Sequence, residues 1–309
     1  MFLSKDFIET AEGFIFAVVA HGTEQGNVLC FLRYIKVDGV WVKVDTEQAN
    51  AMLEEQCPGY LYYSPVLDAQ LHAVALDRIV KHYQPRERLQ QILNKKQSDQ
   101  IEADLIQLCY LLQENGVDLS KIGITGSLLV GVQKQSSDID LICYGRDTFH
   151  QCREKVAKLI RQHQLQDLTE EAWLSSYNRR SCHVSFSEYV WHERRKGNKA
   201  LINERKIDLN FIGDAPNTDT VSYQKSGVIT LQCLVVDDTY AFDYPAVFKI
   251  SHEEYEAIVC FTATYTGQAL AGELIEVSGK IEQTQTGLKR IVVGSTREAV
   301  GEYIKVIHA

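Results

Sequence analysis

Apolar and polar residues follow different periods in three successive parts of the chain. In the first part, β-favouring runs at 14–19 and 28–34 are separated by glycine-containing turns, which predicts a hairpin or meander of strands. A helix is expected to begin at Thr46, which can serve as an N-cap, and a short strand is expected at 60–63. Residues 1–84 are therefore predicted to form a small α+β unit.

Helical periodicity dominates the second part. Between Pro85 and Asn115, leucines and isoleucines recur every three or four positions among polar residues, which predicts one long or two shorter amphipathic helices. Helices and strands then follow one another, and a central domain, 85–215, is expected to hold a mixed sheet flanked by helices. Its expected elements are a strand at about 121–125, a short helix after Gly126-Ser127, a strand at 139–144, helices at about 147–164, 168–178 and 186–196, and a strand at 206–212.

The third part is rich in β-favouring residues. Residues 213–217 indicate a loop, and only Thr296 to Tyr303 hints at a helix beyond it. We expect a C-terminal domain, 216–309, that forms a small all-β barrel or sheet, and we expect the whole chain to be of the α+β class. The predicted strands lie at 228–236, 257–264, 274–281 and 289–293.

Composition and charge narrow the class of protein. The 309 residues include 45% hydrophobic and 24% charged residues, as in an ordinary folded globular chain. Eight cysteines without a C-x-x-C pair indicate reduced core thiols, and no run is long and apolar enough for a membrane span, so a cytoplasmic location is expected. The net charge of -9 argues against a surface that binds nucleic acid throughout. A local basic patch between 179 and 206 is still allowed, although a solvated helix face explains the same residues.

Three aspartates are candidates for a metal site. Residues two apart on a strand point to the same face, so Asp138 and Asp140 can present two carboxylates side by side. The predicted strand at 206–212 also alternates polar and apolar residues, and Asp208 is among its polar positions. Nucleotidyl transfer depends on metal ions that neutralise phosphate charge, and such ions are held by clustered carboxylates.

A candidate phosphate-binding turn lies upstream of these aspartates. A strand that ends in Gly126-Ser127 and opens a short helix would direct backbone N–H groups and the Ser127 hydroxyl toward an anion. Gly126 would permit a close approach of the backbone. Neither the Gly-Ser pair nor the Asp-x-Asp pair is specific alone, but their order and the elements between them are.

The spacing of these residues resembles a known signature. Gly126-Ser127 is followed after three residues by Gly131, and after five more by the run 137–141, Ser-Asp-Ile-Asp-Leu. This pattern is similar to the signature of the DNA polymerase beta-like nucleotidyltransferase superfamily, especially its small bacterial and archaeal members. The match covers about 120–213, and the flanking regions are similar to those of uncharacterised predicted nucleotidyltransferases of prokaryotes.

The resemblance implies a set of roles for the matched residues. Asp138 and Asp140 would bind two Mg²⁺ ions, for which Mn²⁺ can substitute, and Asp208 would join them on the ion that activates the acceptor hydroxyl. Ser127 would contact the triphosphate, and Gly126 and Ser137 are assigned to nucleotide binding with it.

One departure from the pattern concerns the turn after Gly-Ser. Small members of the superfamily often carry arginines there, whereas this chain has the apolar residues 128–130, Leu-Leu-Val. The charge of the triphosphate must then be met elsewhere. The cations proposed for this are Lys134, Arg194, Arg195, Lys199 and Arg205.

The predicted function is transfer of a nucleoside monophosphate from an NTP, with ATP among the candidates, to a hydroxyl acceptor with release of pyrophosphate. The acceptor is left open between an RNA end, DNA, a protein side chain and a small alcohol, and no oligomeric state or membrane partner is indicated. The alternative is a catalytically inert nucleotide-sensing or nucleic-acid-binding protein. Aromatic residues that could stack bases or simply pack a core are Tyr60, Tyr62, Tyr63, Tyr240, Phe242, Tyr244, Phe248 and Tyr265.

Overall fold

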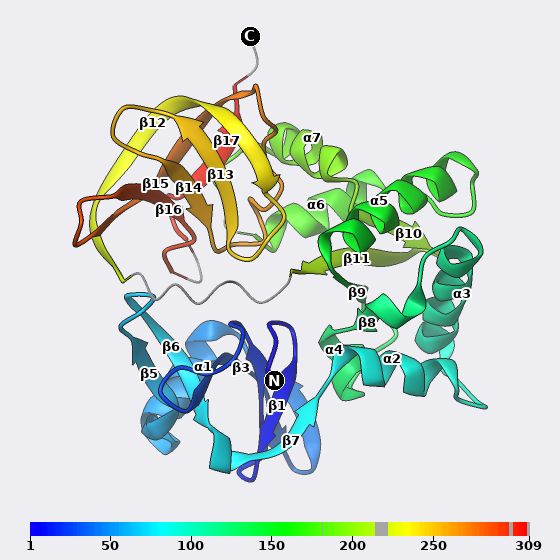
Figure 1. The fold of residues 1–309 in the computed structure, drawn as a ribbon. Coiled ribbons are helices and arrows are strands. Elements are labelled where there is room, and N and C mark those ends of the chain that lie inside the picture. Colours follow the sequence, from blue (N-terminus) through cyan, green and yellow to red (C-terminus); the bar gives the residue numbers. More distant parts are fainter. Residues whose placement is uncertain (181, 214–221, 297–298, 308–309) are drawn as a thin grey trace. The chain divides into compact units, whose positions relative to one another are not determined.

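A computed structural model describes residues 1–180, 182–213, 222–296 and 299–307 of the chain (Figure 1). Helices and several sheets are both present, so the prediction of the α+β class is confirmed. No helix in these ranges is long and apolar enough to cross a membrane. The chain forms two compact units. The first unit comprises Met1–Ser64, Gln70–Leu159 and Leu201–Thr218. The second unit comprises Pro65–Ala69, Ile160–Ala200 and Asp219–Ala309.

The first unit begins with a seven-stranded sheet. Its strands follow the order β5-β6-β3-β2-β1-β7, and β4 pairs with β3. Helix α1 (Thr46–Gln56) starts at the N-cap Asp45, one residue before the expected Thr46, and the Asp45 side chain accepts from the Gln48 backbone N–H. The strands are β1 (Phe7–Thr10), β2 (Phe14–Val18), β3 (Asn27–Val37), β4 (Val40–Lys43), β5 (Leu61–Ser64), β6 (Ala69–Ala75) and β7 (Ile79–Tyr83).

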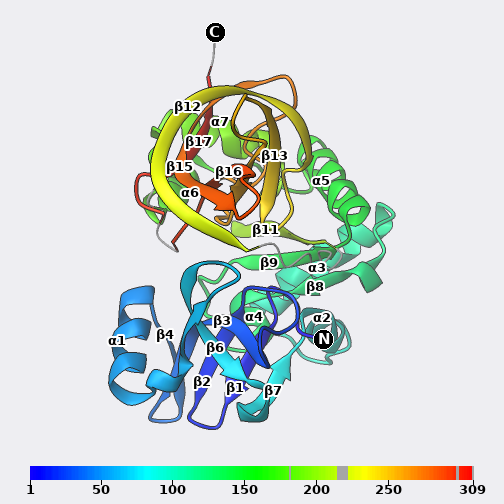
Figure 2. The same ribbon diagram turned by 60° about the vertical axis from the view of Figure 1, so that its left-hand side comes forward.

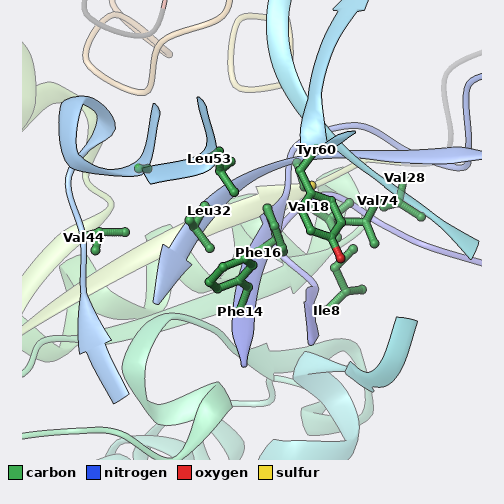
Figure 3. Packing of buried hydrophobic residues seen from close by; sticks show 12 residues of the cluster. Ile8, Phe14, Phe16, Val18, Val28, Leu32, Val44, Leu53, Tyr60 and Val74 are labelled. Atoms are coloured by element: carbon green, nitrogen blue, oxygen red, sulfur yellow. The ribbon is translucent and has the colours of Figure 1, made fainter. Parts of the chain in front are cut away.

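One face of this sheet is closed by α1 and the residues that follow it (Figure 3). Phe16 and Tyr60 pack at the centre with ring centroids 5.2 Å apart, and Leu53 of α1 is fully buried there. Tyr60 therefore belongs to the core, and its hydroxyl reaches the Glu12 carboxylate at 2.9 Å. The other buried members of this cluster are Ile8, Phe14, Val18, Val28, Cys30, Leu32, Val44, Ala49 and Val74.

The central sheet has the strand order β10-β11-β9-β8 and belongs to the first unit, except for Lys199 and Ala200 at the start of β10, which belong to the second. Strands β9 and β11 run parallel, whereas β8 and β9 are antiparallel, so the sheet is mixed as predicted. The helical stretch after Pro85 is divided into two helices by an N-cap at Asp99, whose carboxylate accepts from the Glu102 N–H. The elements are α2 (Pro85–Leu93), α3 (Gln100–Glu114), β8 (Ile122–Ile124), α4 (Gly126–Val130), β9 (Ile139–Tyr144), α5 (Arg146–Arg161), β10 (Lys199–Ile202) and β11 (Arg205–Ile212).

The second unit combines two helices with a β-barrel (Figure 2). Strand β12 pairs with β13 along its second half and with β15 along its first, which closes a ring of five strands in the order β12-β13-β14-β16-β15. Strand β17 adds to β15 outside that ring. The elements are α6 (Glu170–Asn178), α7 (Phe186–Lys196), β12 (Tyr223–Tyr240), β13 (Ala246–Ser251), β14 (Ala257–Cys260), β15 (Leu274–Thr284), β16 (Lys289–Val293) and β17 (Tyr303–Val306).

Two details of the C-terminal prediction can be compared with this barrel. The helix hinted at between 296 and 303 is wrong for its described residues, because 299–302 form a turn that leads into β17, while 297 and 298 lie outside the described residues. The loop predicted at 213–217 also lies outside them beyond 213. Phe248 of β13 and Tyr265 are buried, whereas Tyr240 is exposed.

Candidate active site

Strand pairing in the central sheet brings the predicted aspartates together. Asp140 of β9 and Asp208 of β11 are direct register partners on neighbouring parallel strands. Such strands lie about 4.8 Å apart, and partners in register point to the same face. Asp138 precedes β9 by one residue and lies two positions before Asp140. The three residues therefore gather at one end of the β9–β11 pair.

The pKa of Asp140 is shifted by burial and by the charged side chains around it. The pKa is raised to about 6, first by burial and then by the carboxylates of Asp208 and Asp138. The ammonium groups of Lys206 and Lys5 act in the opposite direction and lower the pKa. Burial and the two neighbouring carboxylates together therefore disfavour the charged form of Asp140, which a nearby cation would favour.

A lysine provides such a cation in this structure. The Lys206 Nζ lies 2.6 Å from Asp208 Oδ2 and 3.3 Å from Asp138 Oδ2, and so bridges the two carboxylates. Lys206 and Asp208 are two residues apart on β11 and so share a face of the strand. The site therefore holds a positive charge among its carboxylates without any added ion.

The carboxylate oxygens of Asp138, Asp140 and Asp208 are suitable ligands for a divalent metal, although they are not arranged to bind one as they stand. Carboxylate oxygens are the ligands that Mg²⁺ prefers, and the Lys206 ammonium marks a place where a positive charge is stabilised. Across the described part of the chain, however, no three His, Cys, Asp or Glu side chains are arranged so that they could hold a metal ion as they stand.

The Gly-Ser turn lies directly against Asp140. Gly126 has a φ of +69°, and a Cβ at this position would stand 2.6 Å from Asp140 Oδ2. The preceding Thr125 N–H donates to the Asp140 carbonyl oxygen at 2.9 Å. Ser127 follows in the first turn of α4 and is partly exposed. Glycine is required here both by the left-handed backbone and by the carboxylate that occupies the space of a side chain.

The N-terminal segment also reaches this site, which the sequence did not indicate. The Thr125 hydroxyl donates to the Lys5 carbonyl oxygen at 2.8 Å, and the Lys5 N–H donates to Val18 O at 3.0 Å. The adjacent Asp6 is buried, and its Oδ2 lies 2.8 Å from His82 Nε2. This contact anchors the residue that follows Lys5. Lys5 is therefore held at the N-cap of α4, and its charge acts on the neighbouring Asp140.

The apolar residues after Gly-Ser have a structural explanation. Leu129 is buried in a cluster with Phe7, Ile15 and Tyr34 of the N-terminal sheet, and Val130 and Val132 pack against it. An arginine at these positions would place its charge in an apolar core. The apolar character of Leu129 and Val130 is therefore explained by the N-terminal sheet that covers this helix.

Arg205 is one of the cations predicted to bind the triphosphate, and in the structure it stabilises the loop before Asp138. Its Nε donates to the buried Asp104 carboxylate of α3 at 2.8 Å, and its Nη1 donates to the carbonyl oxygens of Gln135 and Ser137, each at 2.8 Å. Within the same loop the Ser137 hydroxyl accepts from the Lys134 N–H at 2.9 Å. Arg205 and Ser137 thus shape the loop that presents Asp138, while the side chain of Lys134 is exposed.

The remaining predicted cations lie in the second unit. Arg194 forms an exposed pair with Asp167 at 3.4 Å, and Arg195 is paired with Glu273. Lys199 is buried and lies 2.5 Å from Glu193, which also pairs with Lys196. Burial raises the pKa of Glu193, whereas the charges of Lys196 and Lys199 lower it. The effect of the lysines is larger and holds the pKa far below its ordinary value. Their assignment to nucleotide binding stays a prediction.

Lys206 and Lys5 were not predicted to belong to the site, for different reasons. Lys206 shares the alternation that identified Asp208, so the same two-residue period would have placed it on the same face of the strand as Asp208. Lys5 carries no such signal, because only the tertiary contact with Thr125 brings it to the site.

Comparison with known proteins identifies a relative but no characterised activity. No family model matches the chain, and no solved structure matches it. The chain is 32% identical to "Uncharacterized protein MJ1086" of Methanocaldococcus jannaschii, over an alignment that covers 98% of each protein. At this identity and coverage, the chain belongs to the same protein family as MJ1086.

Proposed function

We propose that the chain is a Mg²⁺-dependent nucleotidyltransferase of the DNA polymerase beta-like type. It would move a nucleoside monophosphate from an NTP to a hydroxyl acceptor and release pyrophosphate. The observation that carries the proposal is the contact between the Gly126 turn and the Asp140 carboxylate, with Asp208 in register beside it. This contact puts backbone N–H groups that can receive phosphate next to carboxylates that can receive a metal, which is the combination that a metal-bound triphosphate needs.

The metal ligands in this proposal are the three carboxylates. Asp138 and Asp140 would hold both Mg²⁺ ions, and Asp208 would share the one nearest the acceptor. When bound, the ions neutralise triphosphate charge and lower the pKa of the attacking hydroxyl.

The protein's own groups would position the reactants. The first-turn N–H groups of α4 and the Ser127 hydroxyl would donate to phosphate oxygens, since both stand at the Gly126 turn. Lys134 would add positive charge from its exposed position on the loop before Asp138. Asp208 would stand beside the attacking oxygen and orient it.

The direct test is label transfer from each α-labelled NTP in Mg²⁺ or Mn²⁺, with total RNA, DNA and a protein extract offered as acceptors. We expect label in one acceptor pool with wild-type protein and none with Asp138→Ala. Asp140→Ala should likewise lose metal-dependent NTP binding, whereas Asp208→Asn should lose transfer and keep much of the NTP affinity. Equal transfer by all three variants and the wild type would overturn the assignment.

A second function is favoured by the Lys206 bridge. A lysine that permanently neutralises Asp138 and Asp208 would leave a site that binds nucleotide without catalysing transfer. Such a nucleotide-sensing protein would show NTP binding by calorimetry with no pyrophosphate release.

Nucleic-acid binding by the barrel has weaker support. Closed five-stranded barrels bind oligonucleotides in other proteins. Here, however, residues 222–309 contain eleven Asp and Glu against seven Lys and Arg, which is a poor match for a phosphate backbone. A steep salt-dependent affinity for RNA or DNA in the absence of NTP would favour this function instead.

A further inference from the structure

Lys206 has an unusual position for a residue beside a candidate metal site. Its side chain is only 11% exposed and its ammonium contacts Oδ2 of both Asp138 and Asp208. These are the carboxylates that the proposed function assigns to metal. An ammonium donates its protons along the lone pairs of a carboxylate oxygen, and a divalent cation needs the same lone pairs. Lys206 and a metal ion therefore compete for the same atoms.

We propose that Lys206 is a tethered counter-ion, which holds the carboxylates together in the metal-free protein and must leave before a divalent cation can bind them. The inference rests on the proposed function and adds a regulatory step to it. Displacement becomes favourable when the incoming cation carries more charge than the ammonium and arrives with a triphosphate. The flexible four-carbon stem of lysine allows the ammonium to swing away while its backbone stays in β11.

A bound triphosphate would be the new partner of the released Lys206 ammonium. Asp138 and Asp208 stand at the same end of the sheet as the Gly126 turn, because Asp140 contacts that turn and pairs in register with Asp208. A triphosphate seated there would present negative charge close to Lys206. The exchange thus replaces a lysine–carboxylate bridge by a metal–carboxylate and a lysine–phosphate contact, and it couples metal binding to nucleotide binding.

The competition can be measured without any activity assay. Mn²⁺ binding, followed by electron paramagnetic resonance in the absence of nucleotide, should be at least about tenfold tighter in Lys206→Met than in the wild type, or about 1.4 kcal/mol. Lys158→Met is the matched control: it removes the same charge from an exposed residue of α5 whose Nζ contacts Asn115, and should leave Mn²⁺ affinity within about twofold. Lys206→Gln provides a second variant if Lys206→Met folds poorly.

A second measurement follows the lysine itself. In NMR spectra of protein with ¹⁵N-labelled lysine side chains, the Lys206 ammonium signal is the one that is absent from Lys206→Met. In the wild type, this signal should shift when Mg²⁺ and a non-hydrolysable NTP analogue are added together. An unchanged Lys206 signal at saturating Mg²⁺ and analogue would overturn the displacement step.

The outcomes separate the inference from the function on which it rests. Equal Mn²⁺ affinity in the wild type and both Lys206 variants, abolished by Asp138→Ala, would refute the counter-ion role and leave the metal site standing. No Mn²⁺ binding by the wild type or by either Lys206 variant would refute both. Tighter binding in the Lys206 variants, lost when Asp138→Ala is added, would support both.

Discussion

The contact between Gly126 and Asp140 makes a quantitative prediction about stability. Alanine at Gly126 would have to adopt a left-handed backbone, which costs a non-glycine residue about 1–2 kcal/mol. Its Cβ would also stand 2.6 Å from Asp140 Oδ2, so the carboxylate would have to leave its place at a further cost of about 1 kcal/mol. We therefore expect Gly126→Ala to destabilise the first unit by about 2–3 kcal/mol.

Gly116 provides the control for backbone strain alone. It has a φ of +89°, and a Cβ there would meet nothing within 4 Å, so Gly116→Ala should cost only about 1–2 kcal/mol. Native-state hydrogen exchange of β8 and β9 amides measures both costs within the same unit. In an Asp140→Ala background the cost of Gly126→Ala should fall to that of Gly116→Ala. The reasoning fails if Gly126→Ala costs no more than Gly116→Ala while Asp140 is intact.

Three further predictions follow from the site and its supports. Because the pKa of Asp140 is raised to about 6, stability of the metal-free protein should fall as pH rises from about 4 to about 6, and Asp140→Asn should remove this part of the pH dependence in denaturation curves. Arg205→Met should loosen the loop before Asp138, seen as faster hydrogen exchange at 134–138 and weaker Mn²⁺ binding; unchanged exchange would contradict its bracing role. Leu129→Ala should cost about 2–5 kcal/mol, and a cost near zero in chemical denaturation would exclude the core that covers α4.

Several parts of the fold were encoded locally. The strand at 139–144 and the helix at 186–196 were both placed within a residue by apolar periodicity, and the helix carries its own start signal, a capping box between Ser185 and Glu188. Strands β6 and β13 were missed, although buried and more exposed residues alternate along β13. Their formation depends on neighbours, since β13 is built between β12 and β14 of the closed barrel.

The sequence by itself determined that the chain is α+β, and it singled out Gly126-Ser127 and the Asp138–Asp140 pair as a candidate site, because a strand period of two sets which side chains share a face. Only the tertiary structure decided that Asp208 stands in register with Asp140, that Lys206 bridges two of the acids, and that Lys5 is held beside them. The physical reason is that periodicity specifies the face of an element but not its partner. Partners are chosen by packing between segments that are far apart in the chain, and the electrostatics of the site follow from that packing.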